Sequence, residues 1–414
     1  MNNCCDVAII GAGPAGACAA SLLAQQGVDV QVFEREQFPR FSIGESLLPQ
    51  CMTFLEQAGL LDAVNQHGFQ RKDGAVFLQQ GQFSHFEFDE KFSPGPSQTF
   101  QVQRDTFDKI LADGAEKNGA KIHYRHQLEA LCNNSKSSNT DYTTLTIKDL
   151  TTDTTKTVNA RFVLDASGFG RVLPRLLDLE SPSDFPVRQA VFTHITDQLP
   201  DSFDRNKILI IVHPQCADIW LWLIPFSNGT SSLGVVARQE QFAEVEHLNH
   251  EQQLMHFVDE IPQLKDLLSN ASVCAQVRCI TGYSANVSTL YGERFALLGN
   301  AGEFLDPVFS SGVTIAMQSA IMAAPLVVKT LNGETVDWEN EFSQPLRRGI
   351  STFKTFVEGW YNGDLRNVIF YPNPDTKIKR MVCSVLAGYA WDSDNPLVKH
   401  SKRRLKALAE SCAQ

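Results

Sequence analysis

The chain of 414 residues is 43% apolar and 20% charged, which is the composition of an ordinary globular protein. Its length exceeds what one hydrophobic core usually serves, so we expect two packed lobes. The formal net charge of -11 disfavours contact with the phosphate backbone of DNA or RNA, and we expect no nucleic-acid partner.

The ten cysteines are scattered along the chain, and no pair belongs to a box with metal-ligand spacing. We therefore expect reduced, buried thiols in a cytoplasmic protein, and no metal site. The apolar stretch from Val7 to Ala24 has no basic leader and is interrupted early by glycines. It predicts a strand, a turn and a helix rather than a signal peptide or membrane span, and we expect no membrane association.

The turn in this first segment has the glycine spacing of a dinucleotide-binding site. Residues 11–16 read Gly-Ala-Gly-Pro-Ala-Gly, after an apolar strand at 6–10. Gly11 makes the tight turn, Gly13 lets the backbone approach the phosphates, and Gly16 lets helix and strand pack closely. With Ala15 at its start, the helix presents free N–H groups and a partial positive charge to a pyrophosphate.

A second predicted strand, residues 28–33, runs directly into Glu34 and Arg35. The carboxylate follows the glycine turn at the spacing at which it accepts hydrogen bonds from the ribose hydroxyls of a bound dinucleotide. An acidic residue there also disfavours the 2′-phosphate of NADP. We count both side chains among the cofactor contacts.

Three later segments indicate FAD. Asp165 ends a buried strand that runs into a small-residue turn, Gly299 and Asn300 end another, and Arg104 precedes an amphipathic helix at 107–118. The order resembles that of the glutathione-reductase-like flavoproteins. In that family a late Gly-Asp pair binds the ribityl chain and pyrophosphate, and an arginine at the position of Arg104 binds the flavin. Asn300 replaces the aspartate, so it can hydrogen-bond but brings no charge.

Two further motifs narrow the family. Residues 40–49 contain Ser42 and the sequence Gly44-Glu45-Ser46, and residues 220–225 read Trp-Leu-Trp-Leu-Ile-Pro. These segments resemble the corresponding motifs of the flavin-dependent halogenases and of allied reductases. The resemblance implies that Trp220 and Trp222 close the route by which an ordinary monooxygenase brings its substrate to the flavin. The alternative is two large core side chains on one face of a strand at a sheet edge.

A lysine completes the halogenase pattern. The segment Lys72-Asp-Gly-Ala75 resembles the one that carries the family's catalytic lysine. The resemblance implies a flavin C4a-hydroperoxide, made from FADH2 and O2, that oxidises halide to hypohalous acid. An ammonium then holds this acid beside the arene, a task that suits a desolvated lysine of lowered pKa. The alternative is that Lys72 lies on an exposed loop.

The segment 306–312 resembles the family stretch beside the isoalloxazine ring. The backbone amides of Ser311 and Gly312 match its proposed halide site, and Val313 begins the next helix. Halogenases of free tryptophan carry a glutamate where this chain has Phe309. The substrate is therefore expected to be a phenol, a carrier-bound pyrrole or a larger arene. The short tail, with helices predicted at 342–361 and 376–390, favours the same conclusion.

We predict an α/β fold with a glutathione-reductase-like FAD domain, a mostly antiparallel substrate sheet and a helical tail. The expected segments are 1–72, 101–175 and 286–335 for the FAD domain, 73–100 and 176–285 for the substrate domain, and 336–414 for the tail. The polar stretch 133–140 predicts an exposed hairpin loop.

No second dinucleotide motif is present, so a separate flavin reductase should supply reducing equivalents. Three alternatives stay open. The chain is similar to flavoproteins that hydroxylate a tryptophan of a partner polypeptide during maturation of a tryptophylquinone cofactor. It also shares motifs with reductases of prenyl chains, against which its acidic charge and tryptophan motif argue. The last alternative is an FAD-binding scaffold without turnover.

Overall fold

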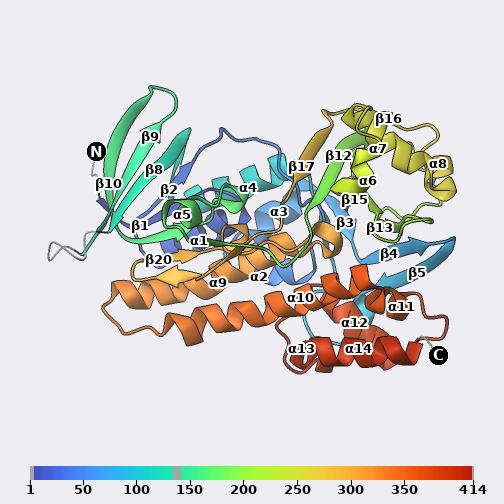
Figure 1. Ribbon diagram of the computed structural model, residues 1–414. Coiled ribbons are helices and arrows are strands. Elements are labelled where there is room, and N and C mark those ends of the chain that lie inside the picture. The colour runs from blue at the N-terminus through green and yellow to red at the C-terminus, as the bar shows by residue number, and fades with distance from the viewer. Residues whose placement is uncertain (1–3, 134–140, 413–414) are drawn as a thin grey trace.

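The computed structural model describes residues 4–133 and 141–412 (Figure 1), so the loop predicted at 133–140 lies almost wholly outside the described residues. One lobe is built on a mostly parallel sheet, a second on a mostly antiparallel sheet, and the C-terminal helices lie beneath the second sheet. The predicted fold class, α/β with a Rossmann-type domain, an antiparallel substrate sheet and a helical tail, is confirmed.

The first sheet carries the glycine turn at the carboxyl end of its central strand. Its main path runs β19-β20-β10-β1-β2-β7, and β8 and β9 extend it as a hairpin against the first half of β10. The central pairs of β1 with β2 and β10, of β2 with β7 and of β10 with β20 are parallel. The strands are β1 (Cys4–Ile10), β2 (Val30–Glu34), β7 (Lys121–Tyr124), β8 (His126–Asn133), β9 (Thr143–Asp149), β10 (Thr154–Asp165), β19 (Tyr291–Gly292) and β20 (Phe295–Leu297).

The helices of this lobe centre on α1, which packs against α9 and α4. They are α1 (Pro14–Gln25), α2 (Gln50–Gln57), α3 (Leu61–His67), α4 (Arg104–Lys117), α5 (Val172–Leu176) and α9 (Ser311–Leu331). By length and composition α9 could cross a membrane, but 61% of its most apolar window is buried inside the protein. The buried apolar residues of α9 therefore belong to the main hydrophobic core. Both α4 and α9 begin two or three residues earlier than the sequence predicted, because the apolar periodicity of a helix does not define its first turn.

The second sheet runs β16-β12-β15-β14-β13-β4-β5, with β17 also paired to β12; its pairs are antiparallel except β13 with β4. Alternation of side chains along β14 divides its residues between two cores. Leu221 and Leu223 join a core under the helices α6 to α8, whereas Trp220 and Trp222 face the main core. The elements are β4 (Gly74–Gln79), β5 (Gln82–Glu87), β12 (Arg188–Thr196), β13 (Lys207–Val212), β14 (Trp220–Pro225), β15 (Thr230–Arg238), β16 (Ser272–Val273), β17 (Arg278–Thr281), α6 (Gln239–Ala243), α7 (His250–Asp259) and α8 (Pro262–Leu267).

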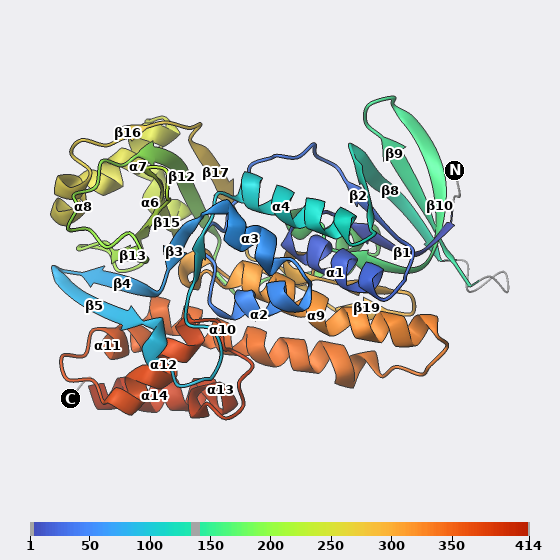
Figure 2. The ribbon, with the colours of Figure 1, turned by 180° about the vertical axis from the view of Figure 1, so that it is seen from behind.

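The C-terminal helices cover the second sheet from below, as the reverse view in Figure 2 also shows. They are α10 (Gln344–Asn362), α11 (Asp364–Ile369), α12 (Thr376–Leu386), α13 (Pro396–Lys399) and α14 (Ser401–Cys412), and a π-helical turn at Glu339–Ser343 precedes them. The helix predicted at 376–390 ends four residues early, because Gly388 takes a positive φ of 100° that stops it. Trp360 on α10 is fully buried against Phe77 of β4, with ring centroids 5.8 Å apart.

The cysteines differ from the prediction in part. All ten are free thiols, but only Cys5, Cys18, Cys51 and Cys383 are buried. Cys4, Cys132 and Cys274 are exposed, since they lie at the start of β1, near the end of β8 and just after β16, where the core does not reach.

Candidate active site

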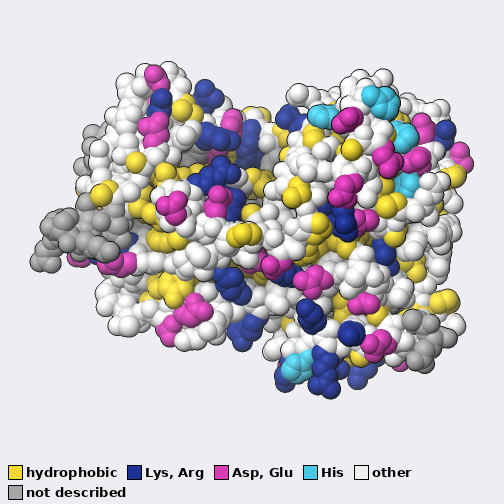
Figure 3. All heavy atoms as spheres, in the orientation of Figure 1, with side chains coloured by type: hydrophobic (Ala, Val, Ile, Leu, Met, Phe, Trp, Pro, Cys, Tyr) yellow, Lys and Arg dark blue, Asp and Glu magenta, His cyan; other side chains and the backbone are white. Residues whose placement is uncertain are grey.

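One cavity lies between the two lobes and is lined by segments far apart in sequence. Figure 3 shows a hollow between the lobes on one face, with Lys and Arg side chains at its edge. The lining includes, from the residues predicted to bind the cofactor or to act in catalysis, Gly11, Gly13, Ala15, Glu34, Arg35, Ser42, Gly44, Glu45, Ser46, Arg104, Trp220, Trp222, Asn300, Gly312 and Val313. The structure thus brings fifteen of the predicted residues to one space.

The glycine turn is shaped by close backbone contacts. Gly11 has a φ of +97°, and a Cβ there would lie 2.6 Å from the carbonyl oxygen of Ala166. A Cβ on Gly16 would lie 2.0 Å from the carbonyl oxygen of Gly11. At Gly13 the nearest atom would be Arg40 Nη2, 3.6 Å away, which is ordinary van der Waals contact, so no backbone clash requires a glycine there. The tight turn at Gly11 and the close packing at Gly16 are those that the spacing predicted, and the approach of phosphate to Gly13 stays a prediction.

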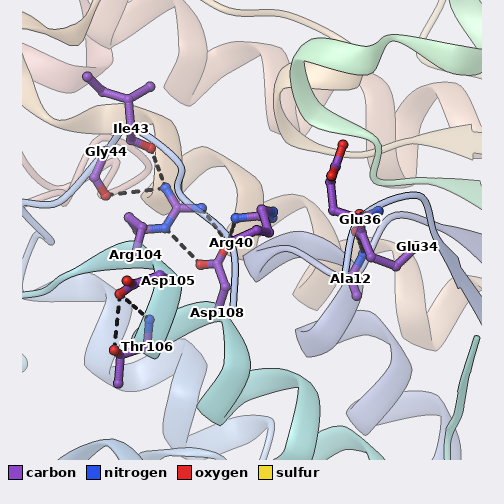
Figure 4. A network of polar contacts seen from close by, with 10 residues as sticks. All are labelled: Ala12, Glu34, Glu36, Arg40, Ile43, Gly44, Arg104, Asp105, Thr106 and Asp108. Atoms are coloured by element: carbon purple, nitrogen blue, oxygen red, sulfur yellow. Dashed lines mark hydrogen bonds and ion pairs between the residues drawn. The ribbon is translucent and has the colours of Figure 1, made fainter. Parts of the chain in front are cut away.

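Glu34 fixes the turn from the neighbouring strand. It ends β2, which pairs in parallel with β1, and the two strand ends therefore meet at one edge of the sheet. One carboxylate oxygen accepts the N–H of Ala12 and the other accepts the N–H of Glu36, each at 2.8 Å (Figure 4). Each oxygen keeps a further lone pair for a ribose hydroxyl.

Arg104 is held by a buried carboxylate at the start of α4. Its Nε and Nη2 donate to the two oxygens of Asp108 at 2.8 and 3.0 Å, and Nη1 donates to the carbonyl oxygen of Ile43 (Figure 4). Arg40 also donates to Asp108, at 2.7 Å. One buried carboxylate thus neutralises part of the charge of two cavity-lining cations and fixes the segment around Gly44.

The residues present fit FAD. Asn300 lines the cavity, and its buried Oδ1 has no hydrogen-bond partner within residues 4–133 and 141–412. A buried unpaired oxygen is costly unless a ligand supplies a donor, and a ribityl hydroxyl is such a donor. The cavity-lining backbone at Gly13 and the cations Arg35, Arg40 and Arg104 suit the pyrophosphate.

Five predicted site residues do not line this cavity: Gly16, Lys72, Asp165, Gly299 and Ser311. Asp165 is fully buried and accepts the N–H groups of Ser167 and Leu173 at 2.8 and 2.7 Å. Burial raises its pKa despite these bonds. Asp165 therefore shapes the turn that lines the cavity instead of facing a ligand itself.

Lys72 lies behind the cavity wall on the short strand β3 (Gln70–Lys72), with 1% of its surface exposed. The alternative of an exposed loop is therefore wrong. Its Nζ donates to Ser46 Oγ at 2.7 Å and to the carbonyl oxygen of Leu47 at 3.0 Å, and lies 5.4 Å from the ring centroid of Phe88. Burial lowers its pKa to about 7. A desolvated lysine of lowered pKa is what the resemblance implied.

The two tryptophans form part of the cavity wall. Trp220 and Trp222 are 1% and 4% exposed, and their ring centroids are 5.7 Å apart. The indole N–H of Trp222 donates to Ser232 at 3.0 Å, and that of Trp220 donates to the hydroxyl of Tyr361 at 2.9 Å. The alternative is right in part: both rings belong to the main core, but they lie on β14, which is paired on both sides, and not at a sheet edge.

Residues of the segment 306–312 form part of the cavity wall. Asp306 accepts the N–H of Val308 at 3.0 Å and the hydroxyl of Tyr361 at 2.9 Å, and Ser310, with a φ of +55°, is the N-cap residue before α9. The free amides at the start of this helix suit an anion, which keeps Ser311 and Gly312 as the predicted halide site. Phe309 is 4% exposed.

Sequence reasoning missed one polar pair at this site. Nε2 of His194 on β12 lies 2.7 Å from an oxygen of Glu45, which lines the cavity. Burial lowers the pKa of His194, but the hydrogen bond and charge of Glu45 outweigh it and the pKa is raised. A single histidine in a predicted strand carries no signal of such a partner. Arg278 was also missed; it stacks over Phe41 at 4.4 Å, and both line the cavity.

Comparisons with known proteins agree with this geometry. A family model described as an FAD binding domain matches residues 4–341. The tryptophan 2-halogenase of Chondromyces crocatus is 33% identical over 382 residues, which cover 88% of this chain and 69% of that protein. The 1H-pyrrole-2-carbonyl peptidyl-carrier-protein chlorinase of Pseudomonas fluorescens is 27% identical over 444 residues, and the match covers 98% of this chain and 94% of that protein.

Among solved structures, a flavoprotein/dehydrogenase from Cytophaga hutchinsonii is 43% identical, with a TM-score of 0.93 and 99% of both chains covered. The predicted FAD cofactor is confirmed. The chain belongs to the FAD binding domain family and, within it, to the flavin-dependent halogenases, and it is an FAD-dependent oxidoreductase of aromatic substrates.

Proposed function

We propose that this protein halogenates an electron-rich arene, a phenol or a carrier-bound pyrrole, and does not act on free tryptophan. The observation that carries the proposal is Lys72. Lys72 is 1% exposed, and its ammonium donates to the hydroxyl of Ser46, a residue that lines the FAD cavity. A prenyl-chain reductase or an FAD scaffold has no need of a buried lysine at this place.

The surroundings of Phe309 support the choice of substrate. Its ring meets those of Phe356 and Trp360 edge-on, with centroids 6.2 and 5.8 Å apart. No carboxylate stands at this position to polarise an arene, so the ring must be reactive by itself. Phenols and pyrroles are, and the Pseudomonas fluorescens relative is named for a pyrrole carried by a peptidyl carrier protein.

Each group of residues has a separate task in this chemistry. Bound as FADH2 and delivered by a separate reductase, the flavin would supply the two electrons that reduce O2 to the peroxide level, and oxygen at that level would oxidise halide. Glu34 and Arg104 orient the cofactor. Trp220 and Trp222 exclude water and substrate from the flavin. The amides of Ser311 and Gly312 bind halide as an anion. The Lys72 ammonium donates a hydrogen bond and exchanges a proton at Nζ.

The test supplies the protein with FADH2 from an added reductase, O2 and bromide. The panel contains a phenol, pyrrole-2-carbonyl carrier protein and free tryptophan. We expect a mass gain of one bromine on the first or second, and none on free tryptophan. The variant Lys72→Met should lose this product, whereas Lys91→Met, at another poorly exposed lysine that donates to Gly95, should keep it. Bromination by Lys72→Met at the wild-type rate contradicts the proposal.

The same assay separates the tryptophan-hydroxylation alternative. A mass gain of one oxygen on a tryptophan of a partner polypeptide, independent of bromide, would support maturation of a quinone cofactor and replace halogenation as the function.

A further inference from the structure

Ser46 links the FAD cavity to the buried ammonium of Lys72. Ser46 lines the cavity and Lys72 does not. In the part of the chain that the structure describes, Ser46 provides the only side-chain hydrogen bond to the Lys72 ammonium, at 2.7 Å, and the carbonyl oxygen of Leu47 takes a second. Whatever Lys72 does for a species in the cavity is therefore done through the Ser46 hydroxyl.

The Ser46 hydroxyl has a proton to give. It accepts from Lys72, and within residues 4–133 and 141–412 it makes no other hydrogen bond. A hydroxyl is one donor as well as an acceptor, so its own O–H is free to point into the cavity. When Lys72 is neutral, its lone pair can accept that O–H, and the oxygen lone pairs of Ser46 then face the cavity. The polarity of this part of the wall follows the protonation of Lys72.

We propose that Ser46 relays a proton from the Lys72 ammonium to an oxyanion in the FAD cavity, hypohalite being the expected one. The O–H bond of Ser46 breaks as its proton passes to the oxyanion, while an N–H bond of Lys72 breaks and that proton passes to Ser46 Oγ. Ser46 is restored, Lys72 is left as a neutral amine, and the oxyanion becomes a neutral acid. This inference rests on the proposed halogenase function for the identity of the oxyanion.

The groups around Lys72 suit a relay near neutral pH. Cys51 on α2 is the titratable group against it, and Cys18 and Tyr389 lie next to Cys51. Burial raises the pKa of all three, so they stay neutral there. Burial lowers the pKa of Lys72 to about 7. A proton donor is most effective when its pKa lies near the working pH.

Three serine variants test the relay. Ser46→Ala removes the hydroxyl, Ser46→Thr retains it, and Ser21→Ala is the control, a buried serine on α1 that donates to the carbonyl of Ala58 at 2.6 Å and does not line the cavity. Bromination is measured from pH 6 to 9. We expect Ser46→Ala to lose activity by on the order of 100-fold at every pH. Ser46→Thr and Ser21→Ala should stay within a few-fold of wild type.

Mixtures of H2O and D2O give a second readout. Two protons move together in the relay, so the wild-type rate should depend on the deuterium fraction along a curve, and that of Ser46→Ala along a straight line. If Ser46→Ala reaches the wild-type maximum at a displaced pH, the hydroxyl only solvates the ammonium and the relay is overturned. Equal behaviour of Ser46→Ala and Ser21→Ala overturns it as well.

Failure of the proposed function is recognised separately. If the wild type brominates no compound of the panel, the proposed halogenation is wrong. The relay is then tested by the rate at which the reduced holoenzyme consumes oxygen. A loss in Ser46→Ala with rescue in Ser46→Thr then supports the relay, and equal rates overturn it. Unfolding of the FAD-free protein across the same pH range reports the Lys72 titration without turnover: Ser46→Ala removes an acceptor from the ammonium and should move the midpoint to lower pH.

Discussion

Burial of the Lys72 ammonium lowers the free energy of unfolding by an amount that can be measured. Burial lowers the pKa of Lys72 to about 7, below its unfolded value, so the unfolded chain binds more protons between about pH 7 and 10. The free energy of unfolding that Lys72 contributes therefore rises with pH in this window and is lowest below pH 7. We expect Lys72→Met to be more stable than wild type at pH 6, by a few kcal/mol in order of magnitude, with the difference shrinking by pH 10.

Denaturant unfolding at a series of pH values measures this difference. Lys117→Met, at an exposed lysine in the last turn of α4, is the control and should show a difference that does not change with pH. A constant difference for Lys72→Met as well would mean that the Lys72 ammonium is not desolvated.

Glu34 is a second residue whose role can be isolated. Both its oxygens accept backbone N–H groups, from Ala12 and Glu36. Glu34→Gln offers one acceptor and places an amide NH2 against the other N–H. We expect it to cost about 1–3 kcal/mol of stability and to weaken FAD binding by roughly 10-fold or more. Quenching of FAD fluorescence on titration measures the affinity. Glu56→Gln, at an exposed position of α2, should bind FAD as the wild type does.

At the scale of elements, one hydroxyl ties three segments together. Tyr361 on α10 accepts from Trp220 of β14 and donates to Asp306, which begins the segment 306–312 in the cavity wall. Arg188 of β12 stacks over the same phenol ring at 3.4 Å. Tyr361→Phe keeps the ring and this stacking but leaves a buried indole N–H and a carboxylate oxygen short of partners.

We expect Tyr361→Phe to lower the unfolding free energy by about 2–4 kcal/mol, because two buried polar groups lose a partner. FAD affinity should fall with it. The matched control is Tyr389→Phe, which removes one hydrogen bond to the carbonyl of Pro96 and should cost about 1 kcal/mol with FAD affinity unchanged. Equal losses in the two variants would show that the three segments are not coupled through Tyr361.

This junction marks what sequence could and could not predict. The glycine turn, Glu34 and the start of α9 are local patterns, because a strand, a turn and a helix adjacent in the chain fix their own geometry. The Tyr361 contacts join residues 55 and 141 positions apart, and the pair of Glu45 with His194 spans 149. Such contacts depend on how whole elements pack, which no spacing in the chain encodes. The sequence pointed to Lys72, but its burial behind Ser46 needed the packed structure.

At the scale of the whole molecule, the flavin site depends on both lobes. Gly13 and Arg104 belong to the first, whereas Trp222 and Ser232 belong to the second sheet, and all four line the cavity. The far face of that sheet has its own core, where α7 contributes Leu254, Phe257 and Val258. The cavity thus lies against one face of the second sheet, while the other face has a core of its own.

Hydrogen exchange with and without FAD can test this arrangement. At 100 times the dissociation constant, FAD should stabilise the folded protein by about 2.7 kcal/mol. We expect slower local exchange at β1, at the start of α9 and at β14, because their ends or side chains line the cavity. Amides of α7 that exchange by local opening should be unaffected, since the second core separates them from the site. Protection confined to the first lobe would place the flavin away from Trp220 and Trp222, and would remove their role as a barrier between cofactor and substrate.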